Sequence, residues 1–183
     1  MPIELTPAGE SWTRADLIRL TDAMIQTVHA TIADCRDADV TFVPADPAAN
    51  DTFAADSSVV NLAWTLGHVI VHATASAEEA AFSAAELARG IERPGRTRYE
   101  VPWETVTTIA QCRARLDESR RMRLATLDVW PDPPHLDTAF RYQEGGKPYN
   151  AYERFIGGLR HAQSHVEQIR DIVGQAKAAR NAG

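Results

Sequence analysis

Two pairs of histidines with the same spacing are the residues in this chain most suited to chemistry. His161 and His165 form one pair, and His68 and His72 form the other, far upstream. Side chains four residues apart on a helix lie one turn above each other on the same face. Each pair can therefore offer two imidazole nitrogens to one metal ion, so a histidine-rich metal site is the first hypothesis.

The downstream pair lies beside a long apolar stripe. Helical periodicity runs through about five turns of a helix predicted from Tyr149 to Ala178. Because His161 and His165 are next to the stripe rather than opposite it, they are expected to point toward the interior of a bundle or its rim. The stripe consists of Phe155, Leu159, Ala162, Val166, Ile169 and Val173.

Three further helices are predicted from apolar periodicity and capping residues. The first begins near Ser11–Thr13, the second runs from Thr65 to Arg89, and the third runs from Glu104 to Leu127. The second helix is rich in alanine, which favours helix and lets neighbouring backbones come close.

The stretches between these helices read as loops. Residues 37–58 and 91–104 are punctuated by proline, and residues 138–143 alternate as in a short hairpin or extended arm. Four amphipathic helices without a convincing sheet predict an all-α four-helix bundle, with residues 1–183 forming one domain.

The composition limits the classes of molecule that this protein is expected to bind. The formal net charge is −6, which argues against nucleic acid. The basic stretch from Arg113 to Arg123 also contains acidic residues, so we interpret it as a solvated helix face. No apolar run reaches the ~18 residues of a membrane span, and the N-terminus lacks a signal-peptide core. Cys35 and Cys112 are expected to be two thiols in the cytoplasm.

Common metal-site signatures are missing. No histidine follows a glutamate at the spacing of di-iron bundles, and Val69 and Ala162 replace the glutamate of zinc proteases. One histidine from the second helix and two from the fourth remain. Three neutral imidazoles with an open position suit a catalytic divalent ion, Zn²⁺ or Ni²⁺, better than a closed structural site.

The sequence leaves open which upstream histidine belongs to that set. Thr65 is a plausible N-cap, and His68 stands where it could serve the start of the helix. His72 lies a full turn further in, among apolar residues, where a buried imidazole needs a partner. His68 therefore stays an alternative ligand beside His72.

At these residues the chain resembles the DinB-like superfamily. Trp64-Thr65, with a histidine eight residues after the tryptophan, is similar to the second-helix motif of that family, and His161-x-x-x-His165-x-x-Gln168-Ile169 is similar to its fourth-helix motif. Glu167 departs from the usual glycine. The resemblance covers about residues 12–178.

The resemblance implies a metal triad of His72, His161 and His165, and a four-helix bundle with a long crossover between the second and third helices. It also implies homodimers and metal-dependent transferases or isomerases that use low-molecular-weight thiols such as mycothiol or bacillithiol. A metal suits that chemistry because it deprotonates a coordinated thiol.

Two functional hypotheses follow. The first is a metal-dependent thiol transferase that acts on an electrophilic small molecule. The second is a non-catalytic small-molecule-binding or stress-associated bundle protein with a vestigial site.

Two polar residues are expected near the metal site. Gln168 continues the face of His161 and His165, and Glu79 shares the face of His72. Either one could orient an imidazole, face the substrate, or simply lie at the bundle rim.

A homodimer is predicted in addition, because several aromatic residues lie outside the apolar stripes and exposed aromatic surface is often interface. These residues are Trp12, Tyr99, Trp103 and Trp130.

Overall fold

Polar caps set where the long helices begin. Thr13, Thr65, Thr108 and Asn150 each accept a hydrogen bond from the backbone N–H three residues further on, which satisfies donors that a first helical turn leaves without partners. The helices that follow are α1 (Arg14–Thr31), α3 (Leu66–Ala88), α4 (Ile109–Leu127) and α5 (Ala151–Ser164), which α6 (Val166–Ala182) continues.

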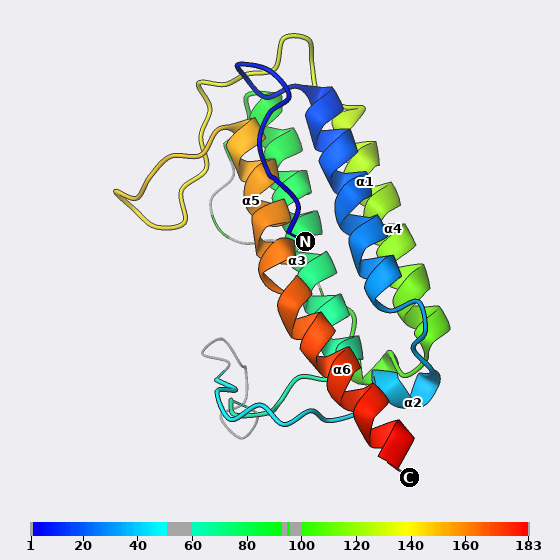
Figure 1. Ribbon diagram of the computed structural model, residues 1–183. Helices are drawn as coiled ribbons and strands as arrows, with labels where there is room; N and C mark the ends of the chain where they lie inside the picture. The colour runs from blue at the N-terminus through cyan, green and yellow to red at the C-terminus, as the bar shows by residue number, and fades with distance from the viewer. Residues whose placement is uncertain (1, 51–59, 93–94, 96–99, 183) are drawn as a thin grey trace.

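The structure is a computed structural model that describes residues 2–50, 60–92, 95 and 100–182. Its long helices form one bundle (Figure 1), which confirms the predicted all-α class. Within the described ranges, every helix is too short or too polar to span a lipid bilayer.

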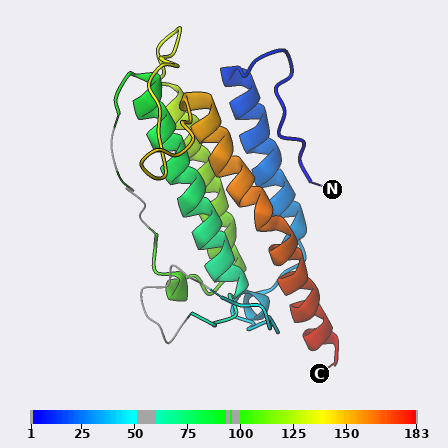
Figure 2. The ribbon, with the colours of Figure 1, turned by 90° about the vertical axis from the view of Figure 1, so that its left-hand side faces the viewer.

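Each helix of the bundle packs against two others. Both α1 and α3 contact α4 and α5, so α1 and α3 lie on opposite corners (Figures 1 and 2). The helices α3 and α4 run in the same direction, and α1 and α5–α6 run in the other. The end of α3 and the start of α4 therefore lie at opposite ends of the bundle, which agrees with the long crossover that the family resemblance implies.

Short elements account for the remaining regular structure. A single helical turn, α2 (Asp37–Val40), follows α1, and a 3-10 turn, η2 (Trp103–Thr105), precedes α4. The third long helix begins at Ile109 rather than at Glu104, because Thr108 and Gln111 form a capping box there. The expected hairpin is reduced to one antiparallel bridge between Phe140 and Tyr149, and the described residues contain no regular strand.

The predicted fourth helix is interrupted at one residue. His165 separates α5 from α6, and its N–H bonds the carbonyl of Ala162, three residues back, at 3.2 Å. Helical bonding resumes at once, since the N–H of Ile169 bonds the carbonyl of His165 at 2.9 Å. The prediction of an uninterrupted helix is wrong here, and the tight turn falls on a site residue.

Apolar side chains from all four long segments fill the centre. Their burial supplies most of the stability of such a bundle. The largest fully buried ones are Leu17, Leu20, Met24, Ile32, Leu66, Ile70, Leu127, Phe155, Ile156, Leu159, Ile169 and Ile172.

Small residues bring α3 and α5 together. A Cβ added to Gly158 would lie 2.5 Å from the Cβ of Ala80 and 3.2 Å from the Cα of Ala77, whereas a Cβ on the adjacent Gly157 would meet nothing within 4 Å. The alanine-rich character of α3 is therefore a packing requirement at the α5 contact.

Part of the basic stretch is buried rather than solvated. Arg115 forms an ion pair with Glu78, and Arg123 is only 2% exposed. Burial lowers the pKa of Arg123 to about 10 and raises the pKa of Glu78, while Arg115 opposes the latter shift. The guanidinium of Arg123 still stays protonated at neutral pH, and Glu78 supplies the nearby countercharge.

Three of the aromatic residues considered for a dimer interface pack within the fold instead, and Trp103 is one of them, partly buried against the core. Trp130 is buried against Tyr152, with ring centroids 5.1 Å apart, and Trp12 packs partly buried against the core. Tyr99 lies outside the described residues. A homodimer stays a prediction that rests on the family resemblance.

The two adjacent glycines predict opposite effects of the same substitution. Gly158→Ala should lower the free energy of unfolding by about 1–3 kcal/mol, because the new methyl group forces α3 and α5 apart. Gly157→Ala should raise it by up to about 1 kcal/mol through helix propensity. Urea unfolding followed by circular dichroism measures both, and equal effects would contradict the close α3–α5 contact.

Candidate metal centre and its cavity

A cavity of about 1040 Å³ lies beside the contact between α3 and α5–α6. Parts of the chain outside the long helices close its rim, among them Asp46, Ala48, Ala49, Asn50, Trp64, Glu100 and Tyr142. It is large enough for a small-molecule ligand.

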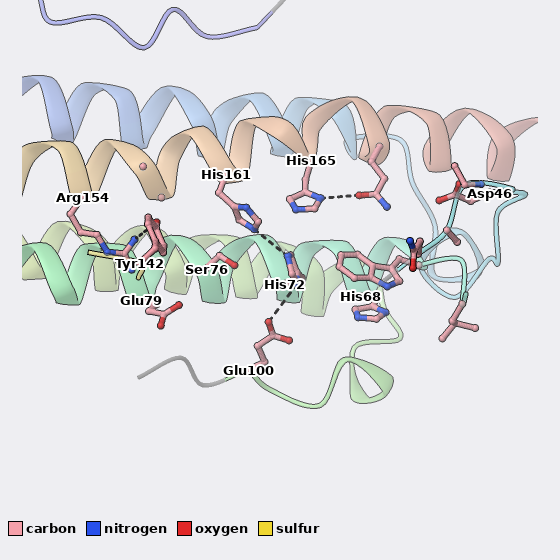
Figure 3. A pocket seen from close by; sticks show the side chains of 18 residues that line it. Asp46, His68, His72, Ser76, Glu79, Glu100, Tyr142, Arg154, His161 and His165 are labelled. Atoms are coloured by element: carbon pink, nitrogen blue, oxygen red, sulfur yellow. Dashed lines mark hydrogen bonds and ion pairs between the residues drawn. The ribbon is translucent and has the colours of Figure 1, made fainter. Parts of the chain in front are cut away.

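Two rows of side chains, one from α3 and one from α5–α6, line this cavity (Figure 3). Residues three or four apart on a helix share a face, and each row follows that spacing. The row on α3 consists of His68, His72, Ser76 and Glu79. The row on α5–α6 consists of Arg154, Gly157, His161, His165 and Gln168.

Three histidines of these rows come together. His72, His161 and His165 each offer a ring nitrogen that lies within 4.8 Å of the other two. Nε2 of His161 is 3.1 Å from Nε2 of His72 (Figure 3). Two nitrogens on one zinc ion are roughly 2.9–3.4 Å apart for ligand angles from 90° to tetrahedral. These three residues could hold a divalent metal ion.

His68 lies apart from that cluster. Its ring stacks between Trp64 and Trp103, with centroid distances of 4.4 and 4.5 Å, and its backbone N–H bonds the Thr65 hydroxyl at 3.3 Å. Of the two upstream histidines that the sequence left open, the structure brings His72 to the downstream pair.

Gln168 fixes the orientation of His165. Its Oε1 lies 2.8 Å from Nδ1 of His165. With the amide oxygen accepting, Nδ1 carries the hydrogen and Nε2 keeps its lone pair for a metal ion. The helical spacing that singled out Gln168 therefore leads to a direct contact with a site histidine.

The carboxylate beside His72 comes from a different residue than expected. Glu100 lies 3.6 Å from Nδ1 of His72 (Figure 3), whereas Glu79 lines the cavity further along α3. Helical spacing could not find Glu100, because it lies in the connection between α3 and α4. Its acidic side chain within that connection was the one available signal.

An aromatic wall borders the histidines. The ring of Trp64 lies 4.6 Å from that of His72 and 6.0 Å from that of His165. Such a surface keeps water away from one side of the imidazoles and strengthens electrostatic interactions beside it.

A buried arginine lines the other end of the cavity. Arg154 is 5% exposed, and its guanidinium lies over the rings of Phe140 and Tyr142 at 4.5 and 5.4 Å. It also donates a hydrogen bond of 3.2 Å to the Tyr142 hydroxyl. We missed Arg154 in the sequence, although it precedes His161 by two helical turns on the same face.

Comparison with known proteins assigns the family. Searches of curated proteins and of solved structures find no significant match. The model of the DinB superfamily matches residues 20–169, a range that includes all three clustered histidines and both helices that carry them. The chain therefore belongs to the DinB superfamily.

Proposed function

We propose that this protein is a metal-dependent enzyme that joins a low-molecular-weight thiol to an electrophilic small molecule. The observation that carries the proposal is the cluster of His72, His161 and His165 at the wall of a large cavity. Three neutral imidazoles leave a coordination position for an exogenous ligand. Zinc and nickel are ions that suit such nitrogen ligands.

A bound divalent ion would lower the pKa of a coordinated thiol and so supply a nucleophile at neutral pH. The residues around the site position and protect that chemistry. With its amide oxygen accepting from Nδ1, Gln168 would hold His165 in the tautomer that presents Nε2, and Glu100 lies at ion-pair distance from His72. Trp64 covers one side of His72, with ring centroids 4.6 Å apart. Such orienting groups typically change metal affinity or activity by 10–100-fold.

Metal binding should depend on each histidine of the triad. Changing His72, His161 or His165 to alanine should remove most bound divalent metal and leave helical circular dichroism largely intact, because apolar packing supplies most of the stability. Elemental analysis of protein purified without a nickel column measures this. His29→Ala is the control, since His29 pairs with Asp117 on another part of the bundle. Retention by His72→Ala with loss in His68→Ala would reassign the upstream ligand.

Loss of the Gln168 amide should weaken metal binding without abolishing it. Gln168→Ala should keep the fold and weaken metal affinity by about 10–100-fold, because His165 loses the acceptor that fixes its ring. Competition with a chromophoric chelator measures the affinity. Gln163→Ala removes an amide from α5 that does not line the cavity and should change nothing. Equal affinities in both variants would place Gln168 at an inert rim.

The reaction itself can be tested with a panel of thiols and an activated aryl halide. The expected step forms a carbon–sulfur bond, breaks the carbon–halogen bond and releases halide and a proton. Metal-loaded protein should accelerate it with at least one thiol, and His161→Ala should abolish the acceleration. Stoichiometric metal without turnover for any thiol would favour the non-catalytic binding protein.

A further inference from the structure

Arg154 lies on the same helix face as His161. Arg154 precedes His161 by seven residues on α5, so the two side chains leave the same face about 10 Å apart along the helix axis. Both line the same cavity (Figure 3). A ligand that reaches the three histidines can therefore also reach Arg154.

The surroundings of Arg154 hold its guanidinium in one place. Phe140 and Tyr142 pack against it, and the Tyr142 hydroxyl accepts a hydrogen bond from it. The bridge between Phe140 and Tyr149 fixes the arm that carries both aromatic rings. A guanidinium is a planar fork whose paired N–H groups match the two oxygens of a carboxylate. A pre-positioned arginine in a cavity is thus suited to recognise an acid.

The path from Arg154 to His161 is bare on the α5 side. Gly157 lies between them on the same face, and a Cβ there would meet nothing within 4 Å. On the α3 side of the cavity, Ser76 is only 8% exposed, and its Oγ has no hydrogen-bond partner among the described residues. A ligand lying over Gly157 would find open space and an available hydroxyl group.

We propose that the cavity binds a carboxylic acid, whose carboxylate is held by Arg154 and whose reacting group lies about 10 Å away at His72, His161 and His165. The second half of this statement rests on the proposed function of the histidine site. The first half depends only on Arg154, Gly157 and the cavity.

Unbranched alkanoic acids and alkanols of equal chain length test the first half by calorimetry. The acids should bind at least about tenfold more tightly than the alcohols, and Arg154→Gln should remove that preference while leaving the alcohols unchanged. Arg154→Lys should recover only part of it, because an ammonium cannot form the paired hydrogen bonds. Equal binding of acids and alcohols, or an unchanged preference in Arg154→Gln, would overturn the proposal.

A second variant tests the path without touching the arginine. Gly157→Val should block long acids, which must pass over this residue, and should retain metal and fold. Gly174→Val is the control, since a Cβ at Gly174 also meets nothing within 4 Å and Gly174 does not line the cavity. Undiminished binding of long acids by Gly157→Val would contradict the assigned path.

Adding a terminal thiol to the acids distinguishes this proposal from the proposed function. In metal-loaded protein the thiol should strengthen binding most at the chain length that spans about 10 Å, and His161→Ala should remove that gain. A persistent acid preference without any gain from the thiol would refute the thiol chemistry and retain the acid site. A gain from the thiol, together with equal binding of the thiol acids and of the matching thiol alcohols, would refute the acid site and retain the thiol chemistry.

Discussion

The close contact between α3 and α5 is the constraint on which the rest of the site depends. Gly158 lies where no side chain fits between the helices, against Ala77 and Ala80. Because the two backbones approach so closely, Nε2 of His72 and Nε2 of His161 come within 3.1 Å of each other. A larger residue at the contact would separate the imidazoles beyond the span of one metal ion.

Around this rigid contact, residues outside the long helices supply the polar environment. Glu100 reaches His72 from the connection between α3 and α4, and Trp103 covers His68 from η2. Tyr142 reaches Arg154 from the arm before α5. This division has a physical reason. Helices position the metal ligands precisely, whereas loops supply the surrounding side chains that decide which molecule binds.

Helical periodicity predicted most of the fold and placed His161 and His165 on one helix face, because both depend on residues that repeat along a helix. The choice of His72 as their partner came from its apolar surroundings and from the family resemblance. Spacing placed Gln168 on the face of His161 and His165, and its contact with His165 is one of the roles that spacing left open. Spacing could not identify Glu100, since no periodicity relates it to His72. It also misjudged the basic stretch, where Arg115 pairs with Glu78 and Arg123 is buried, because burial of a charge depends on a partner from another helix. The turn at His165 likewise has no local breaker residue that could signal it.

The central claim is that three histidines from two helices hold one divalent ion beside the cavity. Anomalous diffraction from crystals of protein loaded with zinc or nickel tests it most directly. The account predicts a single strong peak about 2.0–2.1 Å from one nitrogen each of His72, His161 and His165. A peak ligated by His68, or no peak in well-folded protein exposed to either metal, would contradict it.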